Sequence, residues 1–76
     1  MIPVIDIVST GQRIKEVRKA SGISVRELQD ILGLTNPQAI YAWQNGKCMP
    51  TIDNLVILSA VFDVTLDEMI VTGRGE

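Results

Sequence analysis

Apolar residues recur every three or four positions along most of the chain, as they do at Ile14, Val17 and Ala20. Strict alternation of apolar and polar residues is confined to the short stretch "VIDIV" near the start. A period of three to four is typical of amphipathic helices that share a core, and short connections make neighbouring helices pack together. The pattern therefore predicts an all-α fold, a compact five-helix bundle, with helices at about residues 10–20, 24–32, 37–45, 52–62 and 66–71.

Capping residues support the predicted helix starts. Ser or Thr followed three positions later by Glu or Gln indicates a capping box, in which side chain and backbone satisfy each other's free hydrogen-bonding groups. This pair of residues begins at Ser9, Ser24 and Thr65. Thr51 and Asn36, which lie beside prolines, predict caps for the two remaining helices.

Glycines mark the predicted helix ends. Four of them follow segments with the helical period, where a left-handed residue can close a helix: Gly22, Gly33, Gly46 and Gly73. These boundaries divide the chain into an N-terminal arm at 1–9, a domain at 10–71 and a C-terminal tail at 72–76. The brief alternation in the arm fits either a short edge strand or an ordered arm without a strand.

The charge is distributed unevenly along the 76 residues, whose net charge is −2. Residues 1–50 carry six basic and four acidic side chains, whereas residues 51–76 carry one basic and five acidic side chains. An overall negative charge argues against nucleic acid as a partner, because lysine and arginine usually supply much of the affinity for phosphates. The positive N-terminal part nevertheless leaves a surface on which DNA can bind.

Catalytic and metal chemistry has no support in the composition. The sequence holds one cysteine, Cys48, and no histidine. It offers neither a disulfide, nor a cluster of Cys and His ligands, nor a nucleophile paired with a base. We expect no enzyme activity, no metal and no cofactor, and we interpret Cys48 as an unreactive loop thiol.

The expected location is the cytoplasm. The first apolar run has no basic residues before it, so a signal peptide is not indicated. No stretch approaches the ~20 apolar residues of a membrane span, and a lone cysteine fits a reducing compartment. We therefore expect a soluble protein without a membrane partner.

The segment "TNPQAIYAWQNG", residues 35–46, contains no charged residue but is bounded like a helix. Ile40 and Trp43 are three apart and are predicted to point into the core, while Gln38, Tyr41 and Asn45 fall mainly on other faces. Amides can pair with adenine in the major groove, and small methyl groups or ring edges can contact the thymine methyl. The outer face is therefore a candidate for reading base edges, with cations supplied by neighbouring elements.

The order of motifs over about residues 10–70 resembles the phage-repressor and Cro family of helix-turn-helix proteins, also called XRE-like. The resemblance is carried by "GQRIKEVRKASGISVRELQDILGL" and by "AIYAWQNGKCMPTIDNLVILSAVFDVTLDEMI". It implies a lambda-repressor-like domain in which the second helix crosses the DNA backbone and the third enters the major groove. It also implies a sequence-specific regulator of transcription that binds double-stranded DNA, with repression as the expected action.

The resemblance also implies roles for individual residues. Gln38 is the strongest candidate for reading a base. The residues expected to face base edges or the adjoining backbone are Asn36, Gln38, Ala39, Tyr41 and Ala42. The residues expected to contact phosphate are Ser24, Thr35, Asn45, Lys47 and Thr51.

The sequence departs from the family pattern at several positions. Gln44 stands where relatives carry Glu, so the ion pair that relatives make with the first helix becomes, at most, a hydrogen bond between Arg18 and a neutral amide. Gln29 replaces a small residue, and the turn before the third helix is one residue longer, which we interpret as compensation for the larger side chain. Val25 replaces a Gln that contacts phosphate, which leaves backbone amides at the start of the second helix for that role.

Two questions stay open at the level of sequence. The same scaffold serves protein-interaction modules such as antitoxin-like or anti-repressor partners, and an exposed apolar patch over the second and third helices would favour that alternative. A homodimer can form through the fifth-helix region, with Val64, Leu66 and Ile70, or through the apolar arm. The continuous apolar run Met69 to Val71 favours the fifth helix.

Overall fold

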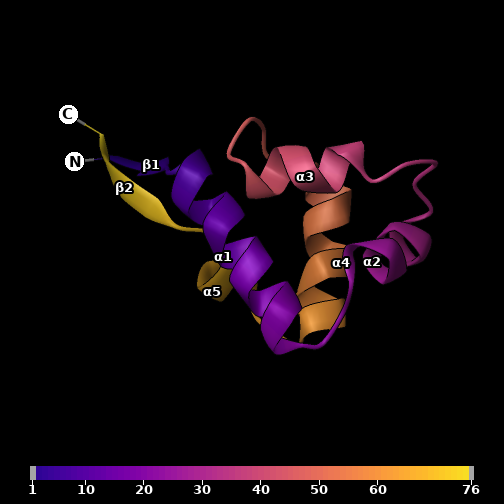
Figure 1. Cartoon of the computed structure of the whole chain (residues 1–76). Coiled ribbons are helices and arrows are strands. Elements are labelled where there is room, and N and C mark those ends of the chain that lie inside the picture. Colours follow the sequence, from indigo (N-terminus) through magenta and orange to yellow (C-terminus); the bar gives the residue numbers. More distant parts are fainter. Residues whose placement is uncertain (1, 76) are drawn as a thin grey trace.

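The computed structural model describes residues 2–75, and their side chains as far as residue 73 (Figure 1). The expected all-α class with five helices is confirmed, with a two-stranded sheet added to it. The helices are α1 (Ile7–Ala20), α2 (Val25–Leu32), α3 (Gln38–Gln44), α4 (Ile52–Phe62) and α5 (Leu66–Met69), and the strands are β1 (Ile2–Ile5) and β2 (Thr72–Gly75). No helix within residues 2–75 has the length and apolar character needed to cross a membrane.

Side-chain caps begin the helices largely where the sequence predicts. Complete capping boxes start α2 at Ser24 and α5 at Thr65, and the Thr51 hydroxyl accepts a hydrogen bond at the start of α4. The predicted cap at Ser9 is wrong. Asp6 caps α1 instead, with its carboxylate accepting hydrogen bonds from the Ser9 amide at 3.0 Å and the Ser9 hydroxyl at 2.9 Å.

The helix ends follow the glycine prediction in part. Gly33 ends α2 in the left-handed conformation, with φ of 69°. Gly22 and Gly46, which follow α1 and α3, both have φ of 72°. Gly73 does not end a helix, because α5 stops at Met69 and Gly73 lies opposite Val4 in the sheet.

A single aliphatic core with two aromatic rings holds the helices together. Each large apolar side chain that is removed from water contributes about 1.5–3 kcal/mol. All five helices supply at least one member of this core, which comprises Ile14, Leu28, Ile40, Trp43, Leu55, Leu58, Phe62 and Met69. The sequence prediction that Trp43 is a core residue is confirmed, since it is 4% exposed.

Helices α1 and α3 approach so closely that their backbones touch. A Cβ atom at Gly11 would lie 2.0 Å from the carbonyl oxygen of Trp43, which is far inside van der Waals contact. Only a residue without a side chain allows α3 to sit this near to α1. The contact therefore fixes the position of α3 on the body of the protein.

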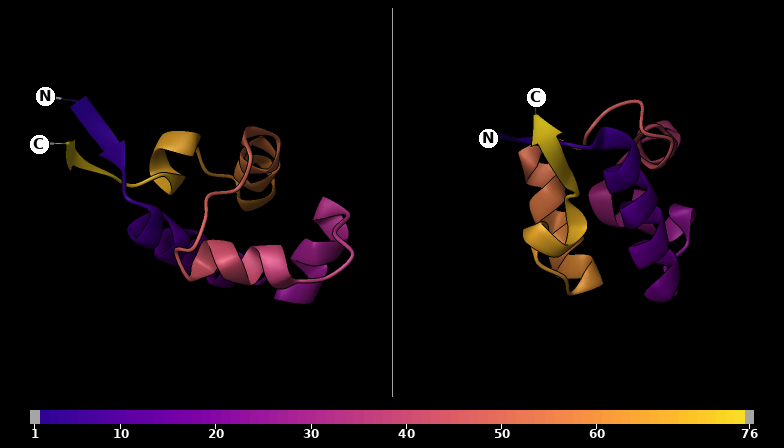
Figure 2. Two further views of the ribbon diagram at one scale, coloured as in Figure 1. Left: turned by 90° about the horizontal axis from the view of Figure 1, so that it is seen from above. Right: turned by 90° about the vertical axis from the view of Figure 1, so that its left-hand side faces the viewer.

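The arm and the tail pair with each other, which resolves the question of the arm in favour of a strand. In the antiparallel β1–β2 sheet, Ile2 lies opposite Gly75 and Ile5 lies opposite Thr72. The sheet projects from the helical body at the end where both termini lie (Figures 1 and 2). Helix α1 begins at Ile7, inside the predicted arm, and residues 1 and 76, the outer ends of the predicted arm and tail, lie outside the described residues.

Candidate nucleic-acid interface

The two faces of α3 differ sharply in burial. Ile40 is 0% exposed and points into the core together with Trp43. On the opposite face Gln38, Tyr41 and Asn45 are exposed, with Tyr41 at 49%. Since these outer side chains follow one another at helical spacing, α3 presents an uncharged surface of amides and one phenol.

Two alanines of α3 are partly exposed. Ala39 and Ala42 are both half-buried, and Ala39 packs against the core cluster. Their methyl groups lie close to the helix axis, which leaves room for a partner to approach the backbone of α3. Four of the five candidates for base contact thus lie on α3, and the fifth, Asn36, lies in the turn that leads to it.

The turn before α3 is held by side-chain amides. The predicted cap at Asn36 is wrong, because α3 begins one residue later than predicted, with Pro37 at the cap position and no side-chain cap there. Asn36 Oδ1 instead accepts a hydrogen bond from the Gln38 amide at 3.0 Å within the turn. Gln29 Nε2 donates to the Leu34 carbonyl at 3.3 Å. This bond supports the interpretation that the longer turn accommodates Gln29.

The hydroxyls of Ser24 and Thr51 lie at two helix N-termini. Ser24 Oγ accepts from the Glu27 amide at 3.0 Å, and Thr51 Oγ1 accepts from the Asn54 amide at 3.4 Å. A hydroxyl that accepts a hydrogen bond can still donate one, so both remain able to bind an oxyanion. At α2 the capping box weakens the attraction for an oxyanion. Glu27 Oε1 already accepts from the Ser24 amide at 3.2 Å, and its carboxylate brings a negative charge to the start of that helix.

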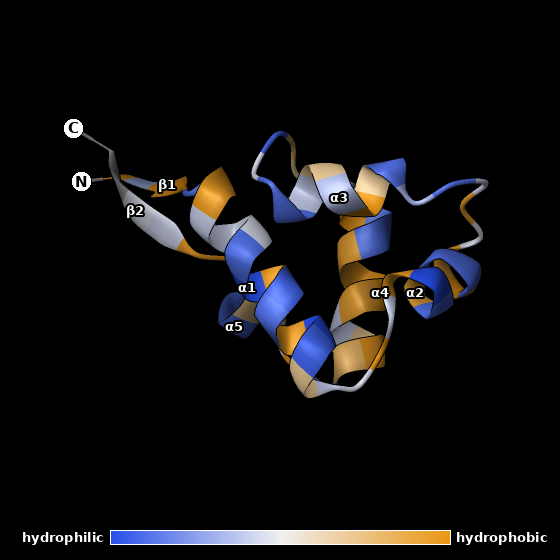
Figure 3. Ribbon diagram, viewed as in Figure 1, coloured by the Kyte–Doolittle hydropathy of each residue, from blue (hydrophilic) through white to orange (hydrophobic). Residues whose placement is uncertain are grey.

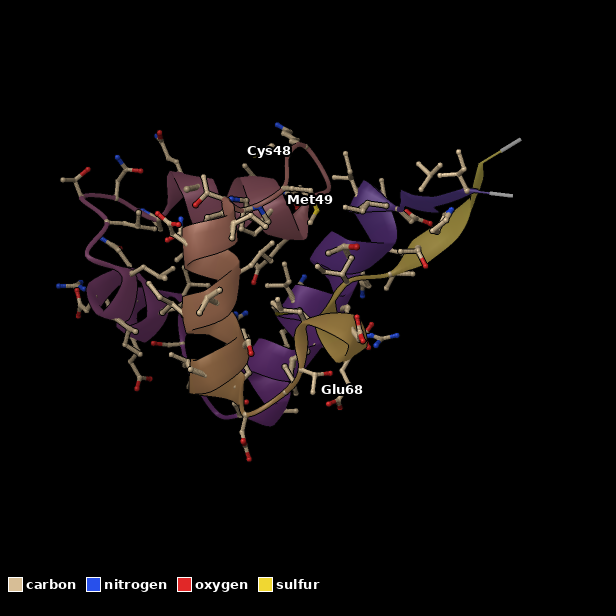
Figure 4. The ribbon with its side chains drawn as sticks, turned by 180° about the vertical axis from the view of Figure 1, so that it is seen from behind. Cys48, Met49 and Glu68 are labelled. Carbon is tan, nitrogen blue, oxygen red and sulfur yellow. The ribbon has the colours of Figure 1, made fainter. Side chains whose placement is uncertain are left out.

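The elements before and after α3 in sequence each carry an exposed cation. Lys47 follows Gly46 in the loop that leaves α3, and its backbone amide is anchored by the Ala42 carbonyl at 2.9 Å. Arg26 is exposed in the first turn of α2. Figure 4 shows the next two residues of that loop, Cys48 and Met49, of which Cys48 is an exposed free thiol.

A buried hydrogen bond connects α1 to the end of α3. Arg18 Nε donates to Gln44 Oε1 at 3.0 Å, and the Arg18 guanidinium also donates through NH1 to the Ile23 carbonyl at 2.8 Å. The sequence prediction of a neutral partner for Arg18 is therefore confirmed. Among the described residues, no group of three or more His, Cys, Asp or Glu side chains could hold a metal ion.

Sequence reasoning located the outer face of α3 but missed the contacts that hold this helix in place. Nothing in the sequence around Gly11 predicts a close contact with α3, and it is simply one of the two glycines that were not assigned to a helix end. The hydrogen bond from the Thr10 hydroxyl to the Val71 carbonyl was also missed, because it joins residues 61 apart in sequence. Neither contact follows from a local pattern.

Both a protein-family model and a known regulatory protein match this sequence. The sequence model of the helix-turn-helix family matches residues 14–69. The HTH-type transcriptional regulatory protein MJ1164 of Methanocaldococcus jannaschii is 36% identical over 56 residues, which cover 74% of this chain. The chain spans only 17% of the length of that protein.

Two solved structures share the fold. The restriction-modification controller protein C.AhdI from Aeromonas hydrophila superposes with a TM-score of 0.73 and 28% sequence identity, covering 84% of this chain and 96% of that one. The clp gene regulator ClgR from C. glutamicum gives a TM-score of 0.70 with 14% identity, covering 82% of this chain and 79% of that one. The likeness to ClgR shows the fold alone.

Proposed function

The chain belongs to the helix-turn-helix family of DNA-binding transcriptional regulators, and we propose that it is a sequence-specific repressor that reads double-stranded DNA with α3. In this proposal α3 lies in the major groove and α2 crosses the backbone beside it. The observation that carries the proposal is the exposed, uncharged face of α3 on a helix whose other face is locked into the core. The protein would repress transcription by occupying a DNA site that the transcription machinery needs. It would act in the cytoplasm.

We assign base readout to the outer face of α3 and to Asn36 in the turn before it. Gln38 is exposed in the first turn, and its amide can pair with both N6 and N7 of adenine. Tyr41 offers a ring edge, and the methyl groups of Ala39 and Ala42 suit thymine. Asn36 Oδ1 accepts from the Gln38 amide, and Asn36 Nδ2 donates to the Thr35 hydroxyl at 3.5 Å, which leaves its second amide hydrogen for a base or the adjoining backbone.

We assign phosphate contacts to polar residues around that face. They share exposure and hydrogen-bond donors: Ser24, Thr35, Asn45, Lys47 and Thr51. Lys47 supplies the only positive charge of this set, so it should contribute most to affinity that does not depend on sequence. The hydroxyls of Ser24 and Thr51 orient the protein on the duplex.

The distribution of apolar surface supports DNA over a protein partner at this face. Among the described residues of α2, α3 and their connection, the exposed large hydrophobic side chains are Ile31 and Tyr41. The other exposed ones lie on the arm, α1, α4 and α5, and Figure 3 shows the hydrophobic colour concentrated on β1 and α4. A continuous apolar patch, as a protein-interaction module would need, is therefore not what α2 and α3 present.

We also propose that two copies associate through the arm, so that two α3 helices reach half-sites ~34 Å apart. In the fifth-helix region Leu66 is 36% exposed, but Met69 is 0% exposed and Ile70 and Val71 are half-buried, so the region offers less apolar surface than the sequence suggests. Strand β1 of the arm instead exposes Ile2 at 77% and Val4 at 52%. An isolated two-stranded sheet is marginal in water, so packing against a second copy would stabilise it.

Analytical ultracentrifugation tests this pairing. Ile2→Ser, in the arm, should shift the protein toward the monomer, whereas the matched change Val56→Ser on the exposed face of α4 should leave the dimer intact. The reverse result would assign the pairing to α4. A wild-type protein that stays monomeric at high concentration would refute the dimer.

Selection of binding sites from random duplex DNA, run at low and at moderate salt, tests the function itself. We expect one recurring sequence to be enriched, more strongly at moderate salt, because added salt weakens phosphate contacts more than base contacts. No enrichment at either salt concentration would contradict sequence-specific binding.

A further inference from the structure

Arg18 is a buried cation whose hydrogen-bond partners carry no charge. Its side chain is 9% exposed, and it donates to the Gln44 amide oxygen at 3.0 Å and to the Ile23 carbonyl at 2.8 Å. These neutral acceptors bind two of the five guanidinium N–H groups but do not cancel the positive charge, and a guanidinium stays protonated in proteins. A full positive charge therefore lies inside the domain.

The two bonds place this charge against both helices of the helix-turn-helix unit. Gln44 is the last residue of α3, and Ile23 directly precedes Ser24, the cap of α2. Both bonds run to shielded groups, since Gln44 is 9% exposed and Ile23 is half-buried. The Arg18 guanidinium thus holds the C-terminal end of α3 and the residue that leads into α2.

We propose that the neutral Gln44 leaves the charge of Arg18 uncancelled, so that it strengthens the attraction of α3 for DNA phosphates at the expense of fold stability. This inference rests on the proposed function. A charge with low-dielectric surroundings is screened less than an exposed lysine, so its field reaches the surface of α3. The chain has a net charge of −2, which repels DNA phosphates. At the surface of α3, the positive field of Arg18 offsets this repulsion.

The cost to the fold has a clear origin. A buried charge without an opposite partner loses hydration and recovers only part of it through hydrogen bonds to neutral groups. A carboxylate at position 44 would convert the bond to Nε into a charge-assisted one, which is shorter and stronger. The same carboxylate would cancel the field of Arg18 toward the DNA.

Gln44→Glu separates these two effects, and Gln12→Glu is its matched control. The control makes the same chemical change and the same change in net charge at an exposed position beside Val71. We expect Gln44→Glu to raise the thermal midpoint by about 4 °C or more. At ~50 mM salt, Gln44→Glu should bind a mixed-sequence duplex about threefold to tenfold more weakly than the wild type does. The difference in affinity between the two proteins should become smaller as added salt shortens the screening length.

The control should change binding less than twofold and should not raise the midpoint. A variant that is more stable and yet binds DNA more weakly cannot be explained by loss of structure. The inference is overturned if Gln44→Glu binds as well as Gln12→Glu, or if it is no more stable than the wild type. Wild-type protein that binds no duplex at low salt refutes the proposed function, and this inference with it.

Discussion

The side-chain oxygen of Thr10 is hydrogen-bonded to both backbone groups of Val71. The Val71 amide donates to Thr10 Oγ1 at 3.0 Å, and the Thr10 hydroxyl donates to the Val71 carbonyl at 3.3 Å. The same carbonyl accepts from the Asp6 amide at 2.8 Å, and Thr10 is 0% exposed. This pair joins the start of α1 to the segment that leads into β2.

Thr10→Val should lower the free energy of unfolding by about 1–3 kcal/mol, because it leaves the Val71 amide without its partner while keeping the shape of the side chain. Urea unfolding measures the change. Thr10→Ser, which keeps the hydroxyl, should retain slower hydrogen exchange at the Val71 amide than Thr10→Val. A valine variant as stable as the wild type would show that the hydroxyl contributes nothing.

Gly11→Ala should destabilise the protein, because the new methyl group would collide with the Trp43 carbonyl. Overpacking of this kind typically costs about 1–3 kcal/mol. Helix propensity alone predicts the opposite sign, since alanine in a helix is favoured over glycine by about 1 kcal/mol. The sign of the change in urea unfolding therefore decides whether the close approach of α1 and α3 exists in solution.

The cap of α1 predicts a dependence of stability on pH. Hydrogen bonds from the Ser9 amide, and then from the Ser9 hydroxyl, hold the pKa of Asp6 below its ordinary value of 3.8. A carboxyl with a lowered pKa stabilises the fold above its unfolded pKa, and that stability is lost as the pH falls through the folded pKa. Asp6→Ala should therefore be less stable than the wild type at neutral pH.

The gap between wild type and Asp6→Ala should close below pH 3.8 as Asp6 takes up its proton in both states. Thermal unfolding from neutral to strongly acid pH follows this gap. A difference that persists unchanged to the lowest pH would mean that the charge of the carboxylate plays no part in the cap.

Much of the helix arrangement was predictable because the signals are local. Ser24 and Thr65 each bond to a residue three positions later, so sequence spacing alone locates these caps. At α1 two capping residues compete, and Asp6 caps the helix while Ser9 becomes its donor. Sequence spacing cannot rank Asp6 against Ser9, since the choice depends on where β1 ends.

The sheet and the support of α3 were not predictable for a different reason. Gly73 follows an apolar segment, which suggests a helix end, but its conformation is set by Val4, far away in sequence. Likewise the outer face of α3 follows from its helical period, whereas its depth is set by the crossing of α1 at Gly11. The period of a helix tells which side faces out but not which helix it crosses.

In the proposed division of roles, the uncharged face of α3 reads bases, and Lys47 beside it supplies affinity for any duplex. Binding of Gln38→Ala and Lys47→Ala to a selected and to a scrambled duplex measures the two roles separately. Gln38→Ala should cut the preference for the selected duplex by about 1–3 kcal/mol and leave the scrambled duplex unaffected. Lys47→Ala should weaken both duplexes equally and flatten the salt slope by about one unit. If the two variants changed both duplexes in the same proportion, the division of roles between α3 and its flanks would be wrong.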